Sequence, residues 1–199
     1  FIGPTGEDRL SGWGDLDTLS GIESAHGSFQ NDILIGAQRS PTLTAGGVGQ
    51  YAVDRSYLRG QMGADTIRAV DAGDGVVADF RDDPAGVVVR LDLGTAEDGW
   101  GFRDTLVNIR AASGTATDDL IVAGADGSWM RGRGGNDTLT GGTGFDVVSY
   151  SDASSGVVVD LALGSAEDGD FGTDLLSGIE FVSGSAFNDS LTGDAGANW

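Results

Sequence analysis

The sequence lacks cysteine and lysine, and it has a single histidine and only 3 prolines in 199 residues. Without cysteine no disulfide can stabilise the fold, and a zinc site built from thiolate and imidazole ligands is disfavoured as well. So little proline argues against a proline-rich linker. No apolar run approaches the ~20 residues of a membrane-spanning helix, so no membrane span is expected.

Positive charge is also scarce. The 11 basic residues, all of them arginine, face 31 acidic residues, which gives a formal net charge of -20. Nucleic acid and anionic membranes are poor partners for such a chain, because phosphate binding needs a basic surface. This acidic balance indicates either a disordered chain or one that binds cations. The hydrophobic fraction of 39% is too high for pure disorder.

Glycine, by contrast, is abundant, with 35 residues that recur in a nine-residue pattern. The pattern is G-G-x-G-x-D-x-U-x, where U is a large apolar residue. Two consecutive copies fill residues 132–149 (GRGGNDTLTGGTGFDVVS). Further copies lie at 12–20 and 60–68, with weaker ones at 3–11, 27–35, 69–77, 114–122 and 184–192. Each copy supplies a tight turn and a short strand, so the sequence predicts an all-β fold, a parallel β-roll.

A longer period lies over this one. Residues 86–99 (GVVVRLDLGTAEDG) recur at 156–169 (GVVVDLALGSAEDG). We expect one continuous roll over residues 1–199, the fragment of a longer protein, in which the valine-rich segments form wider rows. The expected superrepeats are about 1–86, 87–156 and 157–199, and residues 36–50 form an insertion that reads as a surface loop.

In each copy the single apolar residue of the strand is expected to point inward. The predicted core row is Leu19, Leu34, Leu58, Ile67, Val76, Leu106, Ile121, Met130, Leu139, Val148, Leu176 and Leu191. The turn aspartates then stack along the edges of the roll. One edge is expected to carry Asp17, Asp32, Asp65, Asp104, Asp119, Asp137, Asp174 and Asp189, and the other Asp8, Asp74 and Asp146. Like charges at a strand spacing of about 4.8 Å repel by roughly 1–3 kcal/mol per pair, so the ladder needs a cation.

Calcium fits this chemistry best, because it accepts roughly six to eight oxygen ligands in flexible geometry. The aspartates supply carboxylates and the glycine-rich turns supply main-chain carbonyls, with Gly60, Gly132, Gly134, Gly141 and Gly144 as candidates. The cleanest predicted pair is Asp119 with Asp137, which are separated by two full nonapeptides. Three more pairs are expected across one nonapeptide and one shorter row such as NIRAAS at 108–113, namely Asp17 with Asp32, Asp104 with Asp119, and Asp174 with Asp189.

Not every row is expected to bind equally. Ser56, Ser128 and Asn198 replace the turn aspartate in three rows, which should bind calcium weakly or not at all. Asp98 and Asp168, in the two AEDG segments, are candidates for a second class of calcium site, with a plain solvated turn as the alternative.

These repeats resemble the RTX (hemolysin-type) calcium-binding nonapeptides, a resemblance carried by GGTGFDVVS, GRGGNDTLT, GQMGADTIR and GWGDLDTLS. The resemblance implies several calcium ions in the turns, export by type I secretion, and an extracellular or cell-surface location. It also implies a chain that is unfolded at low cytosolic calcium and folds outside the cell. It does not name the activity of the parent protein.

Three functions stay open at this point. The leading one is a non-enzymatic module that folds on calcium and acts as a scaffold or adhesive region, since neither H-E-x-x-H nor G-x-S-x-G occurs. The second is an accessory module that binds acidic polysaccharide or a cell-surface glycan, like those of alginate epimerases. The third is a self-associating surface-layer or matrix protein. Trp13, Trp100, Tyr57 and Trp129 are candidate sugar-binding rings, and His26 is expected to be structural.

Overall fold

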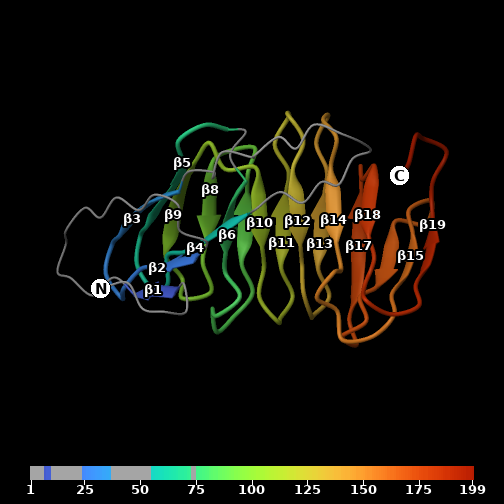
Figure 1. The fold of residues 1–199 in the computed structure, drawn as a ribbon, viewed down its shortest axis with the longest axis horizontal. Coiled ribbons are helices and arrows are strands. Elements are labelled where there is room, and N and C mark those ends of the chain that lie inside the picture. Colours follow the sequence, from blue (N-terminus) through green and yellow to red (C-terminus); the bar gives the residue numbers. More distant parts are fainter. Residues whose placement is uncertain (1–6, 10–23, 37–54, 73–74) are drawn as a thin grey trace, which may run out of the picture.

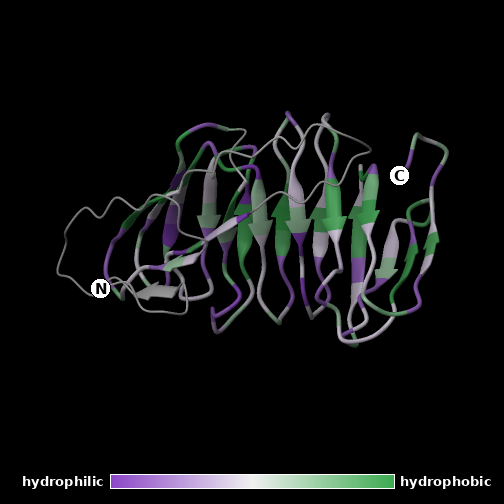
Figure 2. Ribbon diagram, viewed as in Figure 1, coloured by the Kyte–Doolittle hydropathy of each residue, from purple (hydrophilic) through white to green (hydrophobic). Residues whose placement is uncertain are grey.

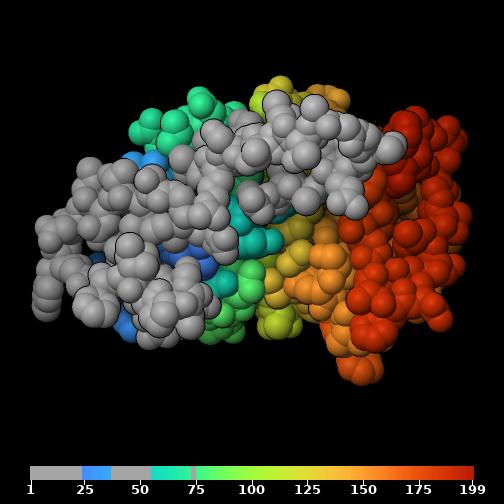
Figure 3. Space-filling view, viewed as in Figure 1, coloured from blue at the N-terminus to red at the C-terminus, as the bar shows by residue number. Residues whose placement is uncertain are grey.

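The structure, a computed structural model, describes residues 24–36, 55–72 and 75–199, and the backbone alone of residues 7–9. Two β-sheets face each other, and their short strands run across the long axis of an elongated body (Figure 1). The chain advances along that axis from the N-terminal to the C-terminal end, as the colours of the space-filling view show (Figure 3). The described segments contain no helix, and so no helix long and apolar enough to cross a membrane.

Among the described residues one sheet has eight strands and the other eleven. The eight-stranded sheet has the order β1 (Glu7–Arg9), β2 (Ser24–His26), β4 (Ser56–Arg59), β6 (Val76–Asp79), β10 (Ala111–Ser113), β12 (Trp129–Arg131), β14 (Val147–Ser149) and β18 (Phe181–Ser183). The eleven-stranded sheet has the order β3 (Ile33–Gly36), β5 (Thr66–Ala69), β9 (Arg103–Val107), β8 (Thr95–Glu97), β7 (Val88–Arg90), β11 (Leu120–Val122), β13 (Thr138–Thr140), β17 (Thr173–Ser177), β16 (Ser165–Glu167), β15 (Val158–Asp160) and β19 (Ser190–Thr192).

The nonapeptides place successive strands in opposite sheets, and the nonapeptide strands within one sheet pair in parallel. From β10 to β14 the chain alternates between the two sheets with every copy, and β11 pairs with β13 while β10 pairs with β12 and β12 with β14. Apolar residues gather in the strands and polar ones in the turns at the edges (Figure 2). This arrangement is a parallel β-roll, which confirms the predicted fold class.

The core lies between the two sheets, where the inward side chains of the strands meet. Ten of the predicted core residues are buried: Leu34, Leu58, Ile67, Val76, Leu106, Ile121, Met130, Leu139, Val148 and Leu176. Leu191 is 50% exposed, so its assignment to the core was wrong. It lies in β19, which pairs with β15 alone among the described strands. Leu19 lies outside the described residues.

The valine-rich segments differ from the expectation. They are not wider rows but antiparallel meanders inside the eleven-stranded sheet. In the first meander β8 pairs antiparallel with both β7 and β9, and in the second β16 pairs antiparallel with both β15 and β17. The third strand of each meander turns back toward strands that come earlier in the chain, because β9 pairs with β5 and β17 with β13. The superrepeat boundaries remain predictions, and residues 37–50 of the insertion lie outside the described residues.

Candidate metal sites along the sheet edge

The turn aspartates lie at one edge of the eleven-stranded sheet, just before or at the start of its strands. The first run of this ladder consists of Asp32, Asp65 and Asp104, which are joined by hydrogen bonds from main-chain N–H groups. The N–H of Asp32 donates to Oδ1 of Asp65 over 2.7 Å, and the N–H of Asp65 donates to Oδ1 of Asp104 over 2.9 Å. One carboxylate oxygen of each rung therefore fixes the neighbouring turn.

A second run repeats the arrangement further along the edge. The N–H of Asp119 donates to Oδ1 of Asp137 over 2.9 Å, and the N–H of Asp137 donates to Oδ1 of Asp174 over 3.0 Å. The structure thus places Asp119 beside Asp137, as the spacing predicted. Beyond the second meander, Asp189 accepts the N–H of Val157 over 2.9 Å.

Two of the three pairs expected across a shorter row are not neighbours, so that expectation was wrong. The strands β8 and β7 lie between Asp104 and Asp119, and β16 and β15 lie between Asp174 and Asp189. Asp104 contacts Asp65 instead, and Asp174 contacts Asp137. The cause is the backward folding of each meander. Asp17, the partner expected for Asp32, lies outside the described residues.

The ladder aspartates differ in whether the second carboxylate oxygen, Oδ2, has a hydrogen-bond partner. Oδ2 of Asp32, Asp119 and Asp189 accepts an N–H from its own turn. Oδ2 of Asp65, Asp104 and Asp137 is buried and has no hydrogen-bond partner in the described part of the chain. None of these three carboxylates forms an ion pair with a described residue, so their negative charge is uncompensated there.

The pKa values of these carboxyl groups also indicate that their negative charge is uncompensated. Burial, with the neighbouring carboxylates adding to it, raises the pKa of Asp65 and of Asp137 to about 8. Burial likewise raises the pKa of Asp104 to about 7, with Asp98 and Asp83 contributing. Ionised carboxylates in such a place need either a proton or a cation. The residues present fit a hard divalent cation, because the side-chain atoms that lack a partner are carboxylate oxygens.

Glycine begins these turns because the aspartate folds back over them. A Cβ at Gly60 would overlap the carboxylate of Asp65, and one at Gly132 would overlap that of Asp137. Gly114 and Gly184 stand in the same relation to Asp119 and Asp189. Gly114 and Gly184 are not among the predicted glycine ligands, although each opens a weaker copy of the repeat, at 114–122 and 184–192.

The other predicted glycines meet different neighbours. A Cβ at Gly141 would overlap the carbonyl oxygen of Gly178, and one at Gly144 would overlap the backbone of Gly127. At Gly134 a Cβ would make only ordinary contacts, so the close packing does not require glycine there.

The eight-stranded sheet carries fewer acidic groups at its equivalent edge. Asp146 accepts the N–H of Ser128 over 2.7 Å, and its own N–H donates to Oε2 of Glu180 over 2.8 Å. Glu180 is therefore a rung that the sequence analysis missed, because the pattern asks for aspartate. Serine, as expected, occupies this position at Ser128.

Asp8 and Asp74 are the two other aspartates predicted for turns at this edge. The register aligns Asp8 with Ala25, inside a strand, so its assignment to a turn was wrong. Asp74 lies outside the described residues. The register also aligns Val76 with Ser56, the residue that replaces the turn aspartate in its own row. In the row of β6 an apolar residue therefore occupies that position.

The two AEDG aspartates lie at the end of β8 and β16, beside the ladder runs. Asp98 is 5% exposed and Asp168 is 0% exposed, and Oδ2 of each lacks a hydrogen-bond partner in the described part of the chain. A plain solvated turn does not describe such buried carboxylates. Across the described residues no three acidic, histidine or cysteine side chains converge into a metal centre of their own. Main-chain carbonyls must therefore supply part of any coordination shell.

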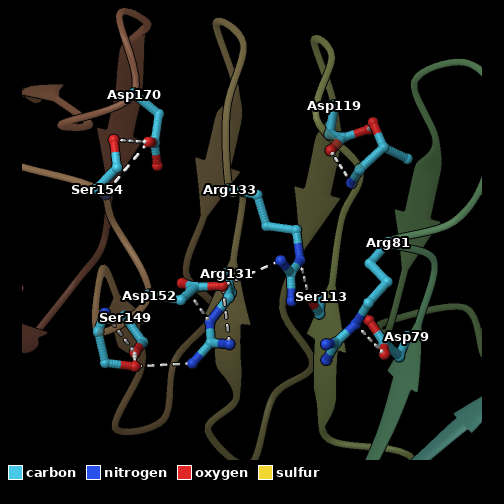
Figure 4. Close-up of polar contacts among 12 residues, drawn as sticks. Asp79, Arg81, Ser113, Asp119, Arg131, Arg133, Ser149, Asp152, Ser154 and Asp170 are labelled. Carbon is cyan, nitrogen blue, oxygen red and sulfur yellow. Dashed lines mark hydrogen bonds and ion pairs between the residues drawn. The ribbon is translucent and has the colours of Figure 1, made fainter.

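The ends of strands in the eight-stranded sheet bear a different polar group, an arginine band of Arg59, Arg81, Arg131 and Arg133. Arg81 contacts Asp79 over 2.7 Å, and Asp152 pairs with Arg131 and Arg133 (Figure 4). Arg59 also contacts Asp79 over 2.7 Å. The free Oδ1 of Asp79 is thus accompanied by two guanidinium groups, unlike the ladder oxygens.

Each described aromatic candidate for sugar binding already contacts another side chain. Arg55 stacks on Trp129 at 3.9 Å, and Arg81 lies over Tyr57 at 5.3 Å. Trp100 packs edge-on against Phe29 at 6.3 Å. His26 contacts Arg59, which agrees with a structural position. Trp13 lies outside the described residues.

Residues 113–148 and 174–199 match the RTX calcium-binding nonapeptide repeat, in four copies. No curated protein matches the chain. A parallel β-roll with buried turn aspartates defines a calcium-binding repeat module. The chain carries RTX repeats, as the sequence predicted, and RTX nonapeptide repeats bind Ca²⁺.

Proposed function

We propose that this chain is a calcium-dependent folding module of an exported protein, in which the aspartate ladder binds the ions. One observation carries the proposal: Asp65, Asp104 and Asp137 are each about 1% exposed, and each has a carboxylate oxygen with no described partner. Bound calcium would supply the positive charge and the oxygen-seeking coordination that these groups need. The nonapeptide match over residues 113–148 and 174–199 supports the same conclusion.

The chain's own residues divide the work at each rung. Oδ1 of Asp137 holds the N–H of Asp119 and so fixes the stacking of two coils, while Oδ2 stays free to act as a ligand. Gly132 lets that carboxylate approach its own turn. The same roles fall to Asp65 and Gly60 in the first run. Because the unfolded chain does not hold these oxygens together, the free energy of binding becomes free energy of folding.

A calcium titration followed by far-ultraviolet circular dichroism tests the proposal. The chain should gain β-structure with a midpoint on the order of 0.1–1 mM, which suits extracellular calcium, and excess EGTA should reverse the change. Magnesium at the same concentration serves as the control and should be much less effective, because it tolerates irregular carbonyl cages poorly. A spectrum that EGTA leaves unchanged would refute calcium-dependent folding.

The biological role that we propose is a structural one, as a spacer, scaffold or adhesive region reached by type I secretion. The exported state follows from the calcium requirement, since a millimolar midpoint would leave the chain unfolded in a low-calcium cytosol. Expression with and without a type I secretion system, with the folded chain assayed outside the cell, tests this route. Retention of the chain in cells that have the system would count against it.

A second candidate, binding of acidic polysaccharide, is supported by one surface feature. A groove of about 250 Å³ is lined by Arg55, Arg110, Trp129 and Phe145, and it combines guanidinium groups with aromatic rings. A glycan array in calcium buffer that includes uronic acid polymers tests it, and no binding to those polymers would count against it. Self-association, the third candidate, predicts light scattering that rises with calcium concentration.

A further inference from the structure

The two AEDG aspartates stand apart from the nonapeptide ladder. Asp98 and Asp168 lie outside the segments that match the RTX repeat, and each follows the central strand of a meander. They hold the same position in the two copies of the longer repeat and occupy equivalent places in the fold. Any property that both share is therefore observed twice in one chain.

Each carboxylate is held by its own loop. Oδ1 of Asp98 accepts the N–H groups of Trp100 and Phe102 over 3.1 and 2.6 Å. Oδ1 of Asp168 accepts those of Asp170 and Gly172, each over 2.8 Å. Both loops thus fix one oxygen and leave Oδ2 buried and without a described partner.

The antiparallel pairing brings these loops to the ladder. Ala96 lies opposite Asp104 in the register of β8 and β9, so the chain leaves β8 at the edge where Asp104 lies. Ala166 lies opposite Asp174 in the same way. Oδ2 of Asp104, like that of Asp98, has no described partner, so two unpartnered carboxylate oxygens lie at the same end of this strand pair.

The second meander also contributes a main-chain oxygen. The position that a Cβ of Gly172 would occupy lies 2.6 Å from Oδ2 of Asp168 and overlaps the carbonyl oxygen of Gly135. These two oxygens therefore face the same small space. Gly135 belongs to the turn of Asp137, whose Oδ2 is likewise without a described partner.

We propose that Asp98 and Asp168 each bind a calcium ion where a ladder run meets its meander, forming a second class of site that nonapeptides alone do not make. The ligands would come from the meander carboxylate, the adjoining ladder carboxylate and a turn carbonyl. The inference rests on the proposed calcium-dependent folding and adds to it two sites with a different sequence signature.

Calcium stoichiometry tests this inference. Native mass spectrometry of the whole chain at saturating calcium compares Asp98→Asn, Asp168→Asn and the double variant with the parent. The control is Asp92→Asn, which removes an exposed carboxylate of the first meander that pairs with Arg90 over 2.6 Å. Each single variant should lose one ion, the double variant two, and the control none.

The outcomes separate the two proposals. A parent chain that binds no calcium would overturn the proposed function itself. A parent that binds and folds, with equal ion counts in all variants, would overturn only the second class of site. Circular dichroism in the same buffer identifies variants that fold.

A second measurement keeps the test decisive if an asparagine variant does not fold. Terbium(III) replaces calcium in oxygen sites and emits when a nearby tryptophan is excited. Trp100 is two residues from Asp98, whereas Asp170 occupies the equivalent place beside Asp168. Trp100→Phe should therefore lower the sensitised emission several-fold while the calcium count stays that of the parent, and Trp129→Phe is the matched control. Emission that is unchanged in Trp100→Phe would overturn the site at Asp98.

Discussion

The two meanders have the same topology but not the same chemistry. In the second, the hydroxyl of Tyr150 donates to Oδ2 of Asp174 over 2.8 Å. In the first, Phe80 takes the equivalent place in the longer repeat, and Oδ2 of Asp104 has no partner in the described part of the chain. The pKa of Asp104 is raised to about 7 and that of Asp174 only to about 6, with burial as the main cause in both.

A second difference is a carboxylate that only the first meander has at its position. Asp83 accepts the N–H of Gly99 over 2.9 Å, while Ala153 stands in its place in the second copy. Burial raises the pKa of Asp83 to about 7. Beside the ladder, the first meander thus adds the carboxylate of Asp83 and lacks the hydroxyl that Tyr150 supplies in the second, so it should depend more strongly on calcium. A tyrosine hydroxyl can thus satisfy a carboxylate oxygen that otherwise needs an ion.

The largest expected effect comes from a small residue that only the second meander has. Gly172→Ala would place a Cβ against the carbonyl of Gly135, so overpacking should cost roughly 1–3 kcal/mol of unfolding free energy. The equivalent Phe102→Ala keeps a Cβ that this site already has, and Phe102 is 42% exposed, so its cost should stay below about 1 kcal/mol. Urea unfolding in saturating calcium measures both. Equal losses would contradict the difference in packing.

Removing the tyrosine hydroxyl from the second meander should increase its need for calcium, and adding one to the first should reduce it. Tyr150→Phe leaves Oδ2 of Asp174 without its donor, which should cost roughly 1.5–3 kcal/mol at low calcium, where the carboxylate has no other partner. Phe80→Tyr should act in the opposite direction at Asp104, by a smaller amount because the new ring must fit a filled core. The calcium midpoint of folding, followed by circular dichroism, should rise for the first variant and fall for the second. Midpoints that do not move would show that the hydroxyl does not replace an ion.

Calcium binding should strengthen as the pH rises from about 6 to about 8. The raised pKa values of Asp65 and Asp137, about 8 against 3.8 in the unfolded chain, mean that the ion-free fold binds protons more tightly than the unfolded chain. The ion-free fold is therefore most stable below about pH 4 and loses that stability as the pH approaches 8. In the folded chain protons compete with calcium for these carboxylates, so the calcium concentration that half-saturates the folded chain should fall about tenfold per pH unit for each proton displaced. Titrations at pH 6, 7 and 8 measure this, and a midpoint that rises with pH would contradict it.

The smallest effect is expected at the exposed pair of Arg90 and Asp92 in the first meander. Their side chains are 39% and 33% exposed, and surface ion pairs contribute little. Arg90→Gln should change the unfolding free energy by less than about 0.5 kcal/mol and leave the calcium midpoint unchanged. A larger change in either would mean that the meanders respond to charge at a distance from the ladder.

The local repeat was sufficient to predict the roll, the inward row and the aspartate edge. A Gly at the first position and an Asp at the sixth specify a turn in which the carboxylate folds back, as Gly132 and Asp137 do. The sequence could not show that Glu180 serves as a rung, because glutamate breaks the pattern and reaches the neighbouring N–H only through the register of β14 and β18.

The alternation of glycine turns and single apolar residues is enough to predict the repeat, the two-sheet roll and the acidic edge. Which aspartates become neighbours depends instead on how distant strands pair. Valine-rich segments pair equally well as parallel rows or as antiparallel meanders, and local alternation does not distinguish the two. The meanders fold backward, so Asp104 joins Asp65 and Asp174 joins Asp137. The same folding buries Asp98 and Asp168 beside the ladder, where each keeps one oxygen without a described partner.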